Sequence, residues 1–382
     1  MASEGSEGSE TADLLGEPTQ CVNVGEPMPD IAGFGVLLGL SVQAFISLVL
    51  AFWVFFWTKL GRLSIQHSEG TAEHASEKKR LGFVSEILMV GNDLQMITGV
   101  ALTITALTDW KDIDLYHLRL VYETVSFVGI SNAAALVCWT FIGAKTKTLK
   151  TRSKHKFIPA YWTPRFRITY VFGVLFLVLT VLLEVRLDEW SLTEEETGFC
   201  YVTTGITTAG ASHPITDKAY VAVTAVWLLM VVFGALFCSV YFRKPLLVLG
   251  GLQFPLHLYM MIKLRIENQP FLDGGESGES EDNWDFGQTT ATLLLGIAVG
   301  QLIHQGMHYI RFERALKKHG AEYALAQDDG KSEPVVSLVE EGLRQVQQLK
   351  QTASGHRSLK STGEERHEES YELMRRSDEN RA

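Results

Sequence analysis

Long apolar segments alternate with short polar ones along most of this chain. The first apolar segment, 31–57, reads IAGFGVLLGLSVQAFISLVLAFWVFFW and contains no formally charged residue. A run of about 20 apolar residues is long enough to cross a bilayer as a helix. Six more apolar segments follow, at 85–108, 118–142, 168–187, 219–242, 246–262 and 286–310. The pattern predicts an all-α protein, a polytopic membrane bundle of about seven transmembrane helices.

The sixth segment is the weakest of the seven. It is short, LLVLGGLQFPLHLYMMI, and it contains Gly250, Gly251, Pro255 and His257. Proline removes a helical hydrogen bond and bends a helix, so a kinked or partial crossing is one alternative for this segment. A full crossing is the other.

The charges between the segments predict an orientation, because Lys and Arg concentrate in cytoplasmic loops. Basic residues follow the first and third segments: Lys59, Arg62, Lys78, Lys79, Arg80, Lys145, Lys147, Lys150, Arg152, Lys154, Lys156, Arg165 and Arg167. The other connections are acidic, for example DEWSLTEEETGFC at 188–200. We therefore expect a luminal or extracellular N-terminus and a cytoplasmic C-terminus, in an endomembrane or the plasma membrane. This requires the sixth segment to cross, although Lys263 and Arg265 at its outer end oppose that reading.

The two ends of the chain are polar. Residues 1–30 begin with the acidic, low-complexity run SEGSEGSE, which is typical of disorder. Residues 313–382 are expected to form a polar cytoplasmic tail, in which 334–349 has the spacing of a short amphipathic helix. The membrane bundle is predicted to span 31–312. The formal net charge of −10 comes largely from tails and loops. No basic stripe with interleaved aromatic residues indicates a nucleic-acid partner.

Polar side chains at the start of the second segment are the first candidates for chemistry. Asn92, Asp93 and Gln95 fall where the chain should enter lipid. An ionisable group at membrane depth is costly and is a functional hypothesis by default. We therefore predict Asp93 as a catalytic acid. Asn92 and Gln95 either line a substrate cavity or hydrogen-bond between helices, and both readings stay open.

A second candidate acid, Glu123, lies in the third segment. Arg119 precedes it by one helical turn, so a purely structural ion pair is an equal alternative for this carboxylate. For that reason Asp93 is the favoured acid of the two. At ~1.5 Å of rise per residue the two carboxylates lie at different depths, so they are not expected to form a dyad. Tyr122, Asn132 and His257 complete the set of expected substrate contacts.

Neither the cysteines nor the histidines indicate a metal site. Cys21 and Cys200 are predicted on the same outer side, where disulfides persist, so we expect them to be bridged unless they lie too far apart. No cysteine pair has CxxC spacing. His304 and His308 are one turn apart, but no clear third ligand accompanies them. We therefore expect no metal and no cofactor.

Three sequence blocks carry a family resemblance. DLQMITGVALTITAL (93–107), YHLRLVYETVSFVGISNAAAL (116–136) and WDFGQTTATLLLGIAV (284–299) resemble the signature blocks of a large group of filamentous-fungal multi-pass membrane proteins. The chain departs from that pattern at Leu94, where the group has Gln, and at Asp285, where it has Gly. The resemblance covers most of 30–312 and implies the seven-span fold. Most members of the group have no assigned activity.

A narrower similarity is to the integral-membrane terpene cyclases of fungal meroterpenoid pathways. These enzymes protonate an epoxide or olefin on a prenyl chain and so start a carbocation cyclisation. A buried carboxylic acid and aromatic walls suit that chemistry, which needs no metal or nucleotide. The predicted function is therefore a membrane-embedded cyclase of the isomerase class, acting on a hydrophobic small molecule.

Two other classes share the predicted topology. A seven-helix sensor or receptor is the first, although the third segment lacks an Asp-Arg-Tyr motif and the last lacks Asn-Pro-x-x-Tyr. The last segment also lacks a lysine for a retinal Schiff base. A transporter or an accessory protein of a biosynthetic cluster is the second. No internal repeat supports a transporter.

Overall fold

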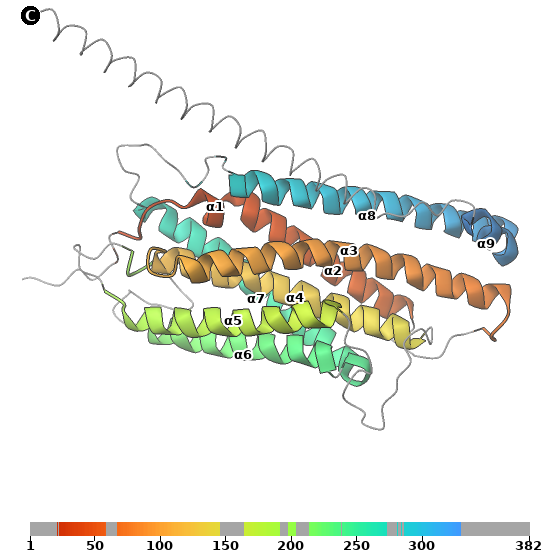
Figure 1. Ribbon diagram of the computed structural model, residues 1–382, viewed down its shortest axis with the longest axis horizontal. Helices are drawn as coiled ribbons and strands as arrows, with labels where there is room; N and C mark the ends of the chain where they lie inside the picture. The colour runs from red at the N-terminus through yellow and green to blue at the C-terminus, as the bar shows by residue number, and fades with distance from the viewer. Residues whose placement is uncertain are drawn as a thin grey trace, which may run out of the picture. The chain divides into compact units, whose positions relative to one another are not determined.

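The computed structural model describes residues 21, 23–58, 67–145, 164–191, 198–203, 214–237, 239–272, 281, 284 and 286–329. The chain divides into two units, Met1–Ala324 and Leu325–Ala382, and the bundle belongs to the first. All regular structure in the described ranges is helical, which confirms the all-α prediction (Figure 1). The helices are α1 (Pro29–Ala32), α2 (Phe34–Trp57), α3 (Ala72–Thr108), α4 (Leu115–Lys145), α5 (Pro164–Asp188), α6 (Ile215–Phe237), α7 (Ser239–Asn268), the 3₁₀ turn η1 (Gln269–Phe271), α8 (Phe286–His319) and α9 (Ala321–Asp329).

Seven of these helical segments are long and apolar enough to cross a membrane, as the sequence predicted. The surface of the bundle carries large apolar side chains. On α6, for example, Val223, Val226 and Met230 are each more than half exposed. A water-facing surface would not be stable with such side chains along whole helices, whereas lipid accommodates them. The chain is a multi-pass membrane protein.

Helix α4 is the centre of the bundle. Every residue from Leu115 to Cys138 is buried, and α4 packs against α2, α3, α5, α6 and α7 (Figure 1). Because no face of this stretch reaches lipid or water, the polar side chains on α4 depend on partners within α4 itself or on neighbouring helices.

Helix boundaries differ from the apolar segments in two places. Helix α3 begins at Ala72, well before residue 85, because Thr71 caps it by accepting a hydrogen bond from the His74 N–H (3.2 Å) and its first turns are polar. The predicted segment 219–242 is interrupted, since α6 ends at Phe237 and α7 begins at Ser239. The residues across this break are still apolar, so hydropathy does not detect it. Helix α7 bends at Phe242 and continues to Asn268, which makes the sixth span long enough to cross.

The ends of the bundle extend past the predicted boundaries. Helix α8 continues to His319, beyond residue 312. The amphipathic helix expected at 334–349 lies outside the described residues, as do residues 1–20. Cys21 and Val24, within the N-terminal segment expected to be disordered, are buried against the bundle.

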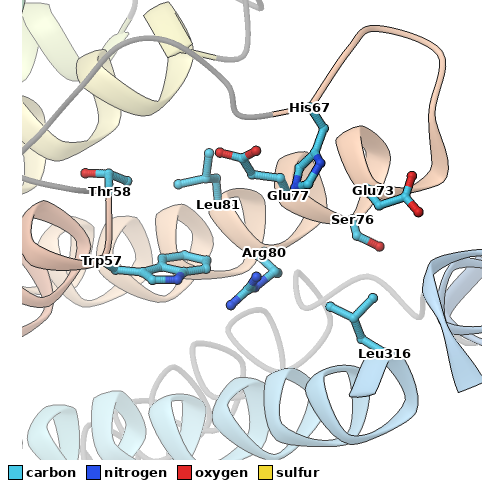
Figure 2. Close-up of a pocket in the computed structure, with 9 residues that line it drawn as sticks. All are labelled: Trp57, Thr58, His67, Glu73, Ser76, Glu77, Arg80, Leu81 and Leu316. Carbon is cyan, nitrogen blue, oxygen red and sulfur yellow. The ribbon is translucent and has the colours of Figure 1, made fainter. Parts of the chain in front are cut away.

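Two cavities follow the seam where α2, α3 and α8 meet. The larger, about 170 Å³, lies between the end of α2, the first turns of α3 and the end of α8 (Figure 2). The smaller, about 20 Å³, lies deeper along the same helices and is lined mostly by apolar side chains such as Ile46, Leu50, Ile87 and Leu302.

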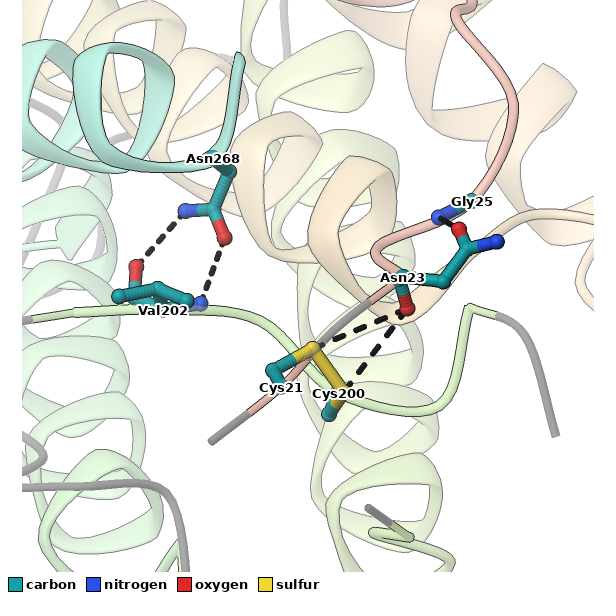
Figure 3. The surroundings of a disulfide bond; sticks show 6 residues. All are labelled: Cys21, Asn23, Gly25, Cys200, Val202 and Asn268. Atoms are coloured by element: carbon teal, nitrogen blue, oxygen red, sulfur yellow. Dashed lines mark hydrogen bonds between the residues drawn. A yellow bond between two sulfur atoms is a disulfide. The ribbon is translucent and has the colours of Figure 1, made fainter. Parts of the chain in front are cut away.

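A disulfide ties the opposite end of the bundle together. Cys21 is bonded to Cys200, as predicted, so the segment before α1 is fixed to the connection between α5 and α6 (Figure 3). We call residues 198–203 the outer strap. Val202 in the strap exchanges two backbone hydrogen bonds with the side chain of Asn268 at the end of α7.

A close helix contact offers a test of the packing. A Cβ atom on Gly99 of α3 would lie 2.6 Å from the side chain of Val128 on α4, and valine has little rotational freedom to move away. We predict that Gly99→Ala lowers the free energy of unfolding by about 1–3 kcal/mol in mixed micelles. Gly91→Ala on the same helix is the control, because its Cβ meets no atom within 4 Å. Equal stability of the two variants would contradict this packing of α3 on α4.

Candidate functional site

Three buried polar side chains and one partly buried tyrosine, from three helices, form one hydrogen-bonded group. Arg119 and Glu123 come from α4, Tyr220 from α6 and His257 from α7, and we call them the Glu123 cluster. Arg119 and the Nδ1 atom of His257 each bond to a different oxygen of the Glu123 carboxylate. The Tyr220 hydroxyl donates to the second of these oxygens at 3.4 Å. Arg119, Glu123 and His257 are fully buried.

Helix periodicity explains how the cluster forms. Arg119 and Glu123 are one turn apart and so project from the same side of α4. On α7, Gln253 and His257 are also one turn apart and both are buried, while Pro255 between them is exposed. Gln253 fixes the register of α7 against α6 by donating to the Thr224 carbonyl at 3.1 Å. This contact helps to bring His257 to the level of Glu123.

His257 has one free nitrogen. Its Nδ1 is bound to Glu123, whereas its Nε2 is buried and has no hydrogen-bond partner among the described residues. Aromatic rings surround the imidazole: Tyr122, Tyr220 and Phe127 have ring centroids 6.2, 6.4 and 6.5 Å from it. A carboxylate that holds one imidazole nitrogen directs the other nitrogen, and this arrangement is common in acid–base and metal sites.

The outer strap covers Arg119. The guanidinium lies over the ring of Tyr220 (4.8 Å) and the ring of Tyr122 (5.4 Å). Tyr201 of the strap is fully buried beside this group, and burial together with the charge of Asp217 raises the pKa of the Tyr201 hydroxyl well above its usual value. The phenol therefore stays neutral at physiological pH. The Cys21–Cys200 bond holds this cover in place (Figure 3).

Asp93 lies outside the cluster. Its carboxylate accepts three hydrogen bonds from Arg165 of α5, and the shortest, from Nη2, is 2.7 Å. The side chains of Asp93 and Arg165 are 43 % and 37 % exposed. The favoured acid from the sequence is thus a half-exposed ion pair, whereas the less favoured Glu123 is at the centre of the bundle.

The carboxamides expected to bind substrate connect helices. Asn92 donates to Asn132 (3.2 Å), and Asn132 donates to Thr169 of α5 (3.0 Å). Gln95 donates to the Leu40 carbonyl of α2 at 3.0 Å. The sequence left two alternatives for Asn92 and Gln95, lining a substrate cavity or hydrogen-bonding between helices, and these contacts match the second. None of these hydrogen bonds reaches the Glu123 cluster within the described ranges.

Sequence reasoning found three of the four cluster members. The Arg119–Glu123 pair, proposed from its spacing, is present. His257 was expected at a substrate site, but its bond to Glu123 was not predicted. Tyr220 was missed, because a tyrosine near the start of an apolar segment gives no signal of its own. The sequence did contain one signal for the α7 side of the cluster. Gln253 and His257 are polar residues one helical turn apart in an otherwise apolar segment.

The histidines of α8 are adjacent, as their spacing predicted. The rings of His304 and His308 are 5.0 Å apart. Across the residues that the structure describes, no three His, Cys, Asp or Glu side chains gather as a metal site would require.

Compared with known proteins, the chain matches no protein-family model, no curated protein and no solved structure. The resemblance to fungal multi-pass proteins therefore stays a prediction that depends on the three sequence blocks.

The two arginine–carboxylate pairs differ in burial and should differ in their contribution to stability. We predict that Arg119→Met lowers the free energy of unfolding by about 3–5 kcal/mol, because it leaves a buried carboxylate without its main counter-ion. Arg165→Met, the matched control at a partly exposed pair, should change it by about 1 kcal/mol or less. Denaturation of both variants in mixed micelles makes the comparison, and a larger loss for Arg165→Met would be the contradictory result.

Proposed function

We propose that this protein is a membrane-embedded cyclase of the isomerase class that acts on a prenylated intermediate of fungal meroterpenoid biosynthesis. The observation that carries the proposal is the His257 imidazole, which is bound to Glu123 through Nδ1 and has a buried, unpartnered Nε2 among the described residues. The three sequence blocks support the fungal origin, and the seven spans support a substrate that is delivered from the bilayer.

His257 is the proton donor in this proposal. Both oxygens of Glu123 already accept hydrogen bonds, so this carboxylate has no free position from which to donate a proton. The Nε2–H of a protonated His257 transfers its proton to the oxygen of an epoxide or to the less substituted carbon of the terminal olefin, which leaves a tertiary cation. The C–O or C=C bond opens, a neighbouring olefin attacks the cation, and loss of a proton from the product cation restores the imidazolium. The reaction is an isomerisation and consumes no co-reactant.

Glu123 is a positioning residue in this scheme. It holds Nδ1 and so directs Nε2 away from itself, and Arg119 balances its charge. The aromatic rings of Tyr122, Phe127 and Tyr220 would form the walls beside Nε2, where their faces stabilise positive charge. Asp93, half exposed and paired with Arg165, has no part in the proposed proton transfer.

Substrate entry requires movement of α7. Neither of the two cavities along the seam is lined by His257. Pro255, two residues before His257, has no N–H with which to bond the carbonyl of Gly251, so α7 is locally weakened at the level of the cluster. Separation of α6 and α7 at this point would open a space beside Nε2.

A sensor is the second candidate, and one observation favours it. The Glu123 cluster joins α4, α6 and α7, so a ligand that breaks one of its bonds would change how three helices pack. A sensor would respond to ligand without converting it, whereas a cyclase would release a rearranged product.

We also propose that the end with the outer strap faces the lumen or exterior. The Cys21–Cys200 disulfide supports this side, because disulfides persist in oxidising compartments. Arg80, Lys317 and Lys318 lie near the other ends of the spans, where cytoplasmic charge is expected.

The cyclase proposal predicts a specific ranking of variants. His257→Gln should lower turnover of a prenylated phenol epoxide roughly 10²–10⁴-fold per folded protein, because it removes the general acid. The control His304→Gln on α8 should keep turnover. Product formation measured by mass spectrometry makes the test, and full activity of His257→Gln would overturn the assignment of the acid.

The positioning role of Glu123 has its own readout. Glu123→Gln should lower kcat with little change in KM, and Glu123→Asp should recover part of the lost kcat because it restores a carboxylate. Asp93→Asn should stay within about threefold of wild type, since this carboxylate lies outside the proposed site. A loss confined to Asp93→Asn would instead support the acid favoured by the sequence.

The orientation predicts protease access. In sealed vesicles with the cytoplasmic side outward, a tag at the C-terminus should be cleaved, and in vesicles with the cytoplasmic side inward it should be protected. The reverse pattern would place Cys21 and Cys200 on the cytoplasmic side and contradict the proposal.

A further inference from the structure

The cavity at the end of α2 has features of a ligand site that the proposed function does not use. Its lining residues are Trp57, Thr58, His67, Glu73, Ser76, Glu77, Arg80, Leu81 and Leu316, and Figure 2 shows them gathered between the ends of α2 and α8 and the first turns of α3. At about 170 Å³ the cavity has room for on the order of ten waters, which is the size of a small polar headgroup.

Ser76 is the clearest sign that the cavity suits a polar ligand. Ser76 is only 3 % exposed, and its hydroxyl has no hydrogen-bond partner in the described part of the chain. Serine in a helix usually bonds to the carbonyl one turn earlier, as Thr103 does to Gly99 (2.7 Å). A buried hydroxyl that makes no such bond and lines a cavity is positioned to donate to an occupant.

The charges of the lining favour a ligand with both signs. Arg80 supplies a guanidinium, which already pairs with Glu313 and lies over the Trp57 ring at 4.4 Å. Glu73 and Glu77 supply two carboxylates. A purely anionic ligand would meet these carboxylates, and a purely cationic one would meet Arg80. A phosphate joined to an ammonium group satisfies both, with the phosphate at Arg80 and Ser76 and the ammonium at the glutamates.

The position of the cavity selects a lipid over a soluble molecule. Trp57 ends α2, and Trp53 and Phe56 beside it are exposed, which is typical of a helix end at the membrane–water boundary. The smaller apolar cavity lies on the same seam. Leu50, which lines it, precedes Trp57 by about two turns of α2, roughly 10 Å along the helix axis towards the middle of the membrane. A headgroup in the larger cavity would thus have an apolar path for an acyl chain along α2, α3 and α8.

We infer that this cavity binds the headgroup of an amine-bearing phospholipid of the phosphatidylethanolamine type. A primary ammonium donates three hydrogen bonds to the carboxylates of Glu73 and Glu77, whereas the trimethylammonium of phosphatidylcholine donates none. Phosphatidylglycerol carries no cation at all. The order of affinity is therefore ethanolamine, then choline, then glycerol.

Native mass spectrometry of the full chain in detergent tests this order. The probes are the three phospholipids with identical acyl chains at equal concentrations. Wild type should retain the ethanolamine lipid in preference to the other two. Ser76→Ala should weaken that retention about three- to tenfold, the effect of one lost hydrogen bond. Ser131→Ala is the matched control, because Ser131 is equally buried and unpartnered but lies on α4.

Two further arms separate the alternatives. Glu73→Gln should narrow the preference for the ethanolamine lipid over the choline lipid, while Glu86→Gln, an exposed residue of the same helix that does not line the cavity, should leave it unchanged. Soluble glycerophosphoethanolamine at the concentration of the lipid should fail to displace it. Displacement would overturn the lipid as ligand, and equal retention of all three lipids, or unchanged binding by Ser76→Ala, would overturn the site.

Discussion

The burial of α4 from Leu115 to Cys138 is the constraint on which the rest of the structure depends. An unpartnered polar group on such a helix is costly, yet α4 carries Arg119, Glu123 and Asn132. Each of them bonds to a side chain of α4 itself or of a neighbouring helix. Arg119 pairs with Glu123, α6 and α7 supply Tyr220 and His257 to Glu123, and α3 and α5 supply Asn92 and Thr169 to Asn132. The order of helices around α4 is thus tied to a few polar contacts, because apolar packing between membrane helices is weakly specific.

The three sequence blocks behind the family resemblance all contribute contacts between segments of the bundle. Gln95 of the first block bonds to α2, and His117 of the second bonds to Glu281 at 3.0 Å. In the third block the backbone N–H of Gly287 donates to Asp30, while the Gln288 side chain accepts from Gly35 of α2. These residues connect the outer ends and middles of helices. The second block also contains Arg119 and Glu123, so it supplies two of the four side chains of the Glu123 cluster on which the proposed reaction depends.

The sequence predicted what one helix determines by itself and missed what two helices determine together. The seven spans follow from apolar length, and the Arg119–Glu123 pair follows from a spacing of one turn. The polar start of α3 and the break between α6 and α7 carry no hydropathy signal. Asp93 was predicted as the catalytic acid from its expected depth in the membrane. Its burial depends instead on the side of α3 from which its side chain projects. The contact between Glu123 and His257 joins residues far apart in the chain, so no local spacing predicts it.

The disulfide has a consequence for how the chain enters the membrane. Four spanning segments, those of α2, α3, α4 and α5, separate Cys21 from Cys200. An even number of crossings returns the chain to its starting side, and an odd number would leave the two thiols on opposite faces, too far apart to bond. Cys21 must therefore wait, reduced, until the fourth crossing is complete. The disulfide therefore forms only in chains in which an even number of helices has crossed the membrane between the two cysteines. A chain in which one of these four helices failed to insert could not form it.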